Sequence, residues 1–213
     1  MKRQINLAEN AFAGCDNRQR LLGNLLVLVR YVNTLRQGLT REGKVLSLGL
    51  QRAIMLLWDF LEGNTLPMEF EDFSNDLYDC YYIDSVGDKD ELPEPFYTEY
   101  FGDDRPCEYE WMAVEWAAGL LMQLVSITGG RLDFDDFEDC RQVDLYGVQL
   151  LMDQLEVIAE SGVIPPFQGI AQVVQHDLQR ARSAGPETFA LLREEYQKYT
   201  IIPEEYAGNL LEY

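Results

Sequence analysis

The sequence predicts an all-α fold, a single helical-bundle-like domain over residues 1–213. Three observations support this. Apolar residues recur at helical spacing along nearly the whole chain, Gly or Pro follows most apolar stretches, and alternation with a period of two is hardly visible. The chain is 47% hydrophobic and 12% aromatic, which allows a packed core despite a net charge of −20. We expect about seven to nine helices.

Two apolar stripes predict the first helices. One covers residues 18–37 and is expected to end at Gly38; the other covers residues 46–61 and closes at Gly63 and Asn64. Their stripe residues, three or four apart, are Leu21, Leu25, Leu28, Val32 and Leu35, then Leu46, Leu50, Ile54, Leu57 and Leu61.

The most apolar stretch, residues 109–128, predicts a central buried helix. Helices are also expected over 143–160, over 167–181 and after Pro186, where Pro suits a first turn. Residues 81–86 could form a short extended piece. The expected core of the central helix is Trp111, Trp116, Leu120, Leu121 and Leu124.

An internal repeat aligns residues 53–73 with residues 117–137 without gaps. Each copy has an apolar helix, a turn containing Gly and an acidic-aromatic segment, so two similar helix hairpins are predicted. Acids in a first helical turn complement the helix dipole. Phe70 and Phe134 should then occupy equivalent packing positions.

Charge is distributed unevenly along the chain. Residues 1–60 carry a net charge of +5, residues 61–140 carry −19 and residues 141–213 carry −6. Such acidity disfavours binding to nucleic-acid phosphates and favours a basic protein partner. The negative field therefore originates in the middle of the chain.

The sequence predicts a cytoplasmic protein. Cys15, Cys80, Cys107 and Cys140 are widely spaced and form no CxxC pair, so free thiols are expected. Residues 12–15 resemble the end of a lipoprotein signal, but polar residues interrupt the apolar region that such a signal needs. We expect no membrane association, because no apolar run approaches about 20 residues.

No catalytic motif supports an enzyme, and we expect no cofactor and no metal. His176 is the sole histidine and is expected at the surface of a helix, and no base can be placed beside Cys107 or Cys140. The acidic clusters around Gly87 and over residues 133–139 could suggest a calcium site, but neither cluster has EF-hand spacing. A pair of glycosidase carboxylates has no predicted barrel or sugar cleft to hold it.

The strongest candidate site is the acidic and aromatic segment 68–109. Pro93, Pro95 and Pro106 predict that much of it is a long ordered loop. Tyrosine offers a large contact area with a hydroxyl to pair, and carboxylates attract a basic partner. The alternative is a structural loop with a solvated acidic face. The candidate partner-binding residues are Asp76, Tyr78, Asp79, Tyr81, Tyr82, Asp84, Tyr97, Tyr100, Asp103 and Asp104.

The stretch Asp79-Cys80-Tyr81-Tyr82-Ile83-Asp84 resembles the acidic, tyrosine-rich faces of bacterial immunity proteins that neutralise nuclease toxins. The run 54–62 with Trp58 is similar to all-helical immunity families found beside polymorphic toxins. The resemblance is one of character over residues 45–160 rather than of a diagnostic motif. It implies a small cytoplasmic protein that occludes one cognate toxin without a cofactor. The basic N-terminal third departs from that pattern.

Three other functions stay open. A nucleic-acid mimic would space its carboxylates at phosphate-like intervals along an elongated surface. A secretion chaperone or adaptor would expose an apolar groove and dimerise. A carboxylate metalloenzyme would need acids from several helices to converge on one point.

Overall fold

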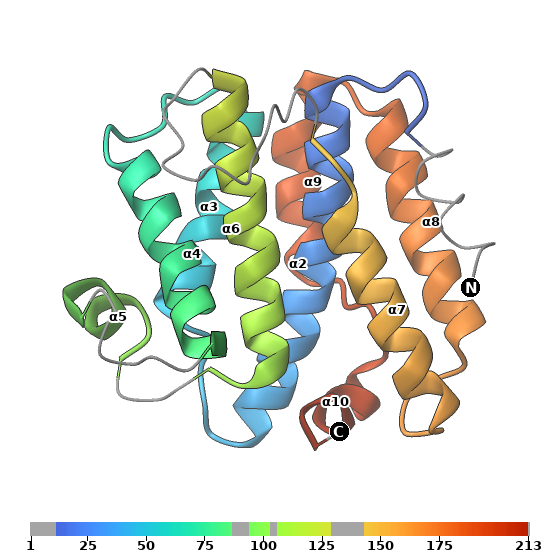
Figure 1. Cartoon of the computed structure of the whole chain (residues 1–213). Helices are drawn as coiled ribbons and strands as arrows, with labels where there is room; N and C mark the ends of the chain where they lie inside the picture. The colour runs from blue at the N-terminus through green and yellow to red at the C-terminus, as the bar shows by residue number, and fades with distance from the viewer. Residues whose placement is uncertain (1–11, 87–93, 103–105, 129–142, 213) are drawn as a thin grey trace. The chain divides into compact units, whose positions relative to one another are not determined.

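The computed structural model describes residues 12–86, 94–102, 106–128 and 143–212. It confirms the all-α prediction: these ranges contain nine α-helices, two short 3-10 helices and no strand (Figure 1). The helices divide between two compact units. Unit 1 comprises residues 1–45 and 144–213, and unit 2 comprises residues 46–143.

Unit 1 is assembled from both ends of the chain. Its helices are α2 (Asn17–Arg41), α7 (Tyr146–Glu160), α8 (Phe167–Ser183), η2 (Pro186–Thr188), α9 (Phe189–Tyr196), η3 (Glu204–Tyr206) and α10 (Ala207–Glu212). The long helix α2 contacts α7, α8, α9 and α10. The N-terminal helix of this unit therefore packs against elements that follow more than 100 residues later in the sequence.

Helix α2 begins as its sequence dictates and ends later than predicted. Asp16 caps its start by accepting a hydrogen bond from the Gln19 backbone N–H, and the Gln19 side chain accepts from the Asp16 backbone in return. The predicted end at Gly38 is wrong, because the helix continues to Arg41. Gly43, with φ +74°, provides the turn instead.

Gly38 has a packing role. A Cβ atom there would lie 2.7 Å from the backbone oxygen of Ala207 and 2.8 Å from Leu211 Cδ1. The missing side chain thus allows α10 to approach the α2 backbone closely. A glycine needed for close approach resembles a helix stop in sequence, which explains the error.

Unit 2 contains α3 (Leu48–Leu61), α4 (Phe70–Val86), α5 (Glu94–Tyr100) and α6 (Glu108–Thr128). Helix α6 contacts both α3 and α4, and its predicted core residues are confirmed as buried. It is the one helix in the described ranges that is long and apolar enough to cross a membrane, yet 67% of its most apolar window is buried inside the protein. That combination is typical of a core helix in a water-soluble protein.

The predicted long loop and the predicted extended piece at 81–86 are both wrong, because α4 runs without interruption to Val86. Residues 68–86 contain no Gly or Pro, and the fold buries a helical stripe of α4. That burial outweighs the strand preference of Tyr81, Tyr82 and Ile83. Pro95 does not prevent α5, because it lies in the first turn, where a missing N–H costs no helical hydrogen bond.

The internal repeat stays a prediction. Both copies begin on apolar helices, residues 53–61 on α3 and residues 117–125 on α6. Phe70 is 9% exposed in the first copy. Phe134 and the acidic segment of the second copy lie outside the described residues.

Candidate functional site

Helix α4 presents one buried face and one acidic, aromatic face. Phe70, Phe73, Leu77 and Cys80, spaced three or four residues apart, are at most 9% exposed. This stripe belongs to the helix that packs against α6. Ser74, on the same stripe, is also buried. The other described side chains of α4 are exposed or half-buried, and these include five of the predicted partner-binding residues.

The acidic row consists of Asp72, Asp76 and Asp79, at positions i, i+4 and i+7 of α4. Neighbours at these spacings lie on one helix face, and like charges there repel. Burial raises the pKa of Asp76, and the charge of Asp72 raises it further. Burial likewise raises the pKa of Asp79, with a second contribution from Asp76. The row therefore holds its negative charge at a cost that a nearby cation would relieve.

The tyrosine cluster consists of Tyr78, Tyr81 and Tyr82 beside the acidic row. The rings of Tyr78 and Tyr82 are nearly parallel, with centroids 6.3 Å apart. Tyr78 and Tyr81 meet edge to face at 6.2 Å. Tyr82 is 52% exposed, whereas Tyr78 and Tyr81 are half-buried. Such rings offer contact area whose orientation is already restricted by their neighbours.

The other predicted site residues lie elsewhere. Tyr97 and Tyr100 are on α5, where their rings pack against Phe101 and Phe73 respectively, and so help to dock that helix. Asp84 is in the last turn of α4, but its side chain is outside the described part of the structure. Asp103 and Asp104 also lie outside it. The site that can be described is therefore the α4 face.

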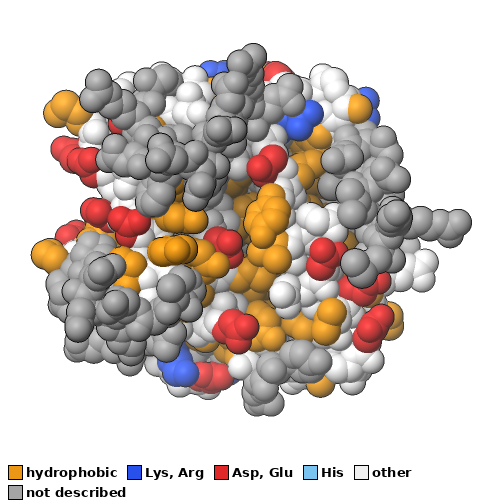
Figure 2. Space-filling model, in the orientation of Figure 1, with side chains coloured by type: hydrophobic (Ala, Val, Ile, Leu, Met, Phe, Trp, Pro, Cys, Tyr) orange, Lys and Arg blue, Asp and Glu red, His pale blue; other side chains and the backbone are white. Residues whose placement is uncertain are grey.

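The space-filling view agrees with this arrangement. Figure 2 shows Asp and Glu side chains beside hydrophobic and aromatic ones over α4 and α6. Unit 2 also carries most of the charge of the protein, with 5 Lys or Arg against 23 Asp or Glu, a net of −18 of the total −20. The α4 face thus belongs to a strongly negative unit.

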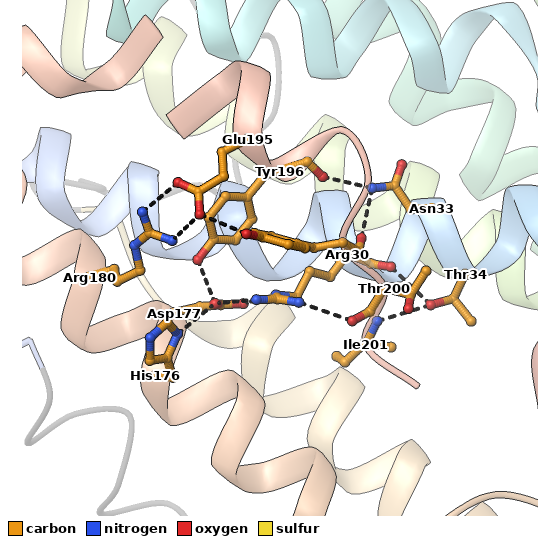
Figure 3. Close-up of polar contacts among 11 residues, drawn as sticks. Arg30, Asn33, Thr34, His176, Asp177, Arg180, Glu195, Tyr196, Thr200 and Ile201 are labelled. Atoms are coloured by element: carbon orange, nitrogen blue, oxygen red, sulfur yellow. Dashed lines mark hydrogen bonds and ion pairs between the residues drawn. The ribbon is translucent and has the colours of Figure 1, made fainter. Parts of the chain in front are cut away.

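Unit 1 contains a buried polar network that sequence reasoning missed (Figure 3). Arg30 of α2 donates from Nε and Nη2 to the two carboxylate oxygens of Asp177 on α8, at 2.5 and 3.1 Å. Arg30 Nη1 donates to the Thr200 backbone oxygen at 3.1 Å. Its guanidinium also lies 5.0 Å from the ring centroid of Tyr196 and 4.7 Å from that of Tyr199.

Further bonds extend this network to α9 and the segment after it. The Tyr196 hydroxyl donates to Asp177 Oδ1 at 2.6 Å, and burial together with this bond raises the pKa of Tyr196. Asn33 Nδ2 donates to the backbone oxygens of Tyr196 and Tyr199. The network therefore ties α8, α9 and residues 199–201 to α2.

The outer rim of the network is an ion pair. Arg180 and Glu195 form two parallel hydrogen bonds, at 2.9 and 2.6 Å. These bonds, with one from the Tyr199 hydroxyl, lower the pKa of Glu195 to about 2. His176 lies next to Asp177 but is exposed, as predicted from sequence.

The network is a structural clamp. The Arg30 guanidinium is paired on both sides, and Asp177 accepts from Arg30 and Tyr196, so neither charge is left for an added ligand. One sequence signal could have indicated it: Arg30 is a single charge in the otherwise apolar run 25–32, and such a charge needs a buried partner. The partner itself, 147 residues away, is not indicated by any local pattern.

Metal-binding and thiol chemistry find little support in the described ranges. They contain no group of three or more His, Cys, Asp or Glu side chains placed to share a metal ion, and the acidic residues 88–91 and 133–139 lie outside them. Cys15 and Cys107 are free thiols, and burial raises the pKa of Cys107, which disfavours its reactive thiolate.

Comparisons of the chain with protein-family models, with curated proteins and with solved structures found no match.

Proposed function

We propose that this chain is an immunity-type protein of the bacterial cytoplasm. It binds a cognate basic protein toxin and neutralises it by occluding the active or substrate-binding site, without catalysis or a cofactor. The observation that supports this most is that the acidic row and the tyrosine cluster occur together on the sides of α4 that stay exposed or half-buried. The free thiols agree with a reducing compartment.

The electrostatic part of the argument concerns association. A unit with a net charge of −18 attracts a cationic surface over several ångströms and raises the association rate. On arrival, a Lys or Arg of the partner relieves the repulsion among the carboxylates of the acidic row. The raised pKa values of Asp76 and Asp79 mark where that repulsion and burial act together.

The second part of the argument concerns the lifetime of the complex, to which the tyrosine cluster contributes. Binding energy concentrates in a few desolvated anchors, among which tyrosine is enriched. Tyr82 is the most exposed ring of the cluster, and its near-parallel contact with Tyr78 restricts its rotamers before binding. Less side-chain entropy is therefore lost on complex formation.

The test is a binding titration against the protein encoded by the neighbouring gene, at low and high salt. Tyr82→Ala is expected to weaken affinity by roughly thirtyfold, as for a moderate anchor. Asp79→Asn should slow association and reduce its salt dependence. Tyr146→Ala and Glu160→Gln, which change an exposed tyrosine and an exposed acid of unit 1, are the matched controls and should bind like the parent.

Binding that ignores salt and tolerates both α4 substitutions would show that this face is structural. A nucleic-acid mimic is the second candidate, because the acidic row repeats its carboxylates every three or four residues, about 4.5–6 Å along the helix axis. In that case Asp79→Asn would weaken binding to a DNA-binding enzyme while Tyr82→Ala would not.

A further inference from the structure

A continuous series of aromatic contacts links α5 to the tyrosine cluster. Tyr97 contacts Phe101 with ring centroids 5.3 Å apart, and Phe101 contacts Trp111 of α6 at 4.9 Å. Trp111 in turn contacts Tyr81 of α4 at 6.4 Å. Tyr81 then meets Tyr78, which meets Tyr82. Each separation is within the range of attractive ring pairs.

Trp111 is the central member of this series, and packing rather than a hydrogen bond to a described residue holds its indole. It is 7% exposed, and its buried Nε1 has no hydrogen-bond acceptor among the residues described. Buried indole N–H groups are ordinarily paired, and the pairing fixes the ring. Here the indole contacts the rings of Phe101 and Tyr81, which help to set its position.

Helix α5 in turn depends on its docking. Its seven residues are fewer than an isolated helix needs to be stable in water. It lies at the edge of unit 2 beside α4 (Figure 1), where Phe96 and Tyr100 contact Phe73. Phe101 fits against α3 because Gly49 has no side chain: a Cβ there would lie 3.1 Å from Phe101 Cζ.

We propose that Phe101 and Trp111 are positioning residues for partner recognition. Docking of α5 presses Phe101 onto Trp111, Trp111 supports Tyr81, and Tyr81 holds Tyr78 and Tyr82 in the arrangement that a partner meets. The link to a partner rests on the proposed function of the α4 face, whereas the coupling between α5 and α4 does not. Energetic coupling through contiguous packed side chains is the physical basis.

The coupling is tested on the free protein by hydrogen exchange and by nitration of Tyr82, both read by mass spectrometry. Phe101→Ala should speed amide exchange in residues 78–83 by roughly two- to tenfold, the effect of losing one aromatic pair on local opening. Nitration of Tyr82 should rise in parallel, and Phe101→Tyr should restore both rates. Phe189→Ala is the control, because it removes a buried phenylalanine from unit 1 and should leave residues 78–83 and Tyr82 of unit 2 unchanged.

The outcomes separate the two proposals. If Phe101→Ala frees α5 but leaves residues 78–83 and Tyr82 unchanged, or if it speeds exchange equally throughout α3 and α4, the positioning role is wrong. If the coupling is present and the neighbouring-gene protein does not bind, the proposed function fails while the coupling stands. If that protein binds Phe101→Ala as tightly as the parent, the positioning role in recognition is overturned.

Discussion

Asp177 illustrates how a single residue depends on its tertiary surroundings. Its side chain is fully buried, which would be very costly for an unpaired carboxylate. Arg30 and Tyr196 supply donors from two other helices. Its neighbour His176 is exposed on the same helix, so one step along the chain separates a buried clamp from a solvent-facing side chain.

Asp177→Asn is expected to destabilise the protein by about 3–5 kcal/mol, because it leaves the largely buried Arg30 charge without its partner. Urea unfolding measures this loss. Glu195→Gln is the control: its ion pair with Arg180 is partly exposed, so the cost should be about 0.2–1 kcal/mol. If both variants lost the same free energy of unfolding, the buried ion pair would contribute no more to stability than the partly exposed one.

At the scale of elements, two helix glycines differ in whether a neighbouring helix packs against them. Gly38 of α2 is contacted by α10, whereas a Cβ on Gly119 of α6 would have no atom of the described residues within 4 Å. Both glycines sit inside helices, so local propensity treats them alike. Only the packing distinguishes their roles.

Gly38→Ala should therefore destabilise the protein by about 1–3 kcal/mol through overpacking against Ala207 and Leu211. Gly119→Ala should stabilise it by about 0.5–1 kcal/mol, because alanine is the better helix former and meets no neighbour. Thermal or urea unfolding gives both values, and hydrogen exchange should show the Gly38→Ala effect first in α10. A neutral Gly38→Ala would contradict the close contact.

At the scale of the whole molecule, the two units contain carboxyl groups whose pKa values are shifted in opposite directions. In unit 2, burial raises the pKa values of Asp76, Asp79 and Glu110, the last despite hydrogen bonds from Ser47. In unit 1, Arg180 and Tyr199 lower the pKa of Glu195 to about 2. The charge follows the same division, with −18 in unit 2 and −2 in unit 1.

Opposite pH dependences follow. Carboxyls with raised pKa values bind protons more tightly in the native state, so their contribution to stability is complete below the unfolded pKa and is lost as pH rises through the folded pKa. The double variant Asp76→Asn, Asp79→Asn should thus be more stable than the parent at pH 7 and equal to it below roughly pH 4. Urea unfolding across this pH range checks the difference.

Glu195→Gln should behave in the reverse sense. The lowered pKa of Glu195 stabilises the native state above its unfolded value near 4.5, and that contribution disappears as pH falls toward 2. The variant should therefore be less stable than the parent at neutral pH and converge with it in acid. The same slope with pH for both variants would contradict the assignment of these shifts.

Local sequence patterns are enough to predict the fold class and the position of most helices. Stripes with a period of 3.6 at 18–35, 46–61 and 109–128 are local patterns, and burial of those faces confirmed them. The sequence also identifies the acidic and aromatic residues of α4 as a candidate site, because their clustering is visible in the residue types alone. The prediction over 68–86 is wrong because the local strand preference of residues 81–83 obscures a helical stripe. That stripe consists of Phe70, Phe73, Leu77 and Cys80.

Which side chains meet depends on how the helices pack and is not encoded in any local pattern. Arg30 and Asp177 are 147 residues apart, and the Phe101, Trp111 and Tyr81 rings come from three separate stretches of unit 2. Periodicity reveals that a face is buried but not against which partner, since many apolar faces fit one another about equally well. The clamp, the role of Gly38 in helix contact and the support of the tyrosine cluster by α5 therefore required the packed structure.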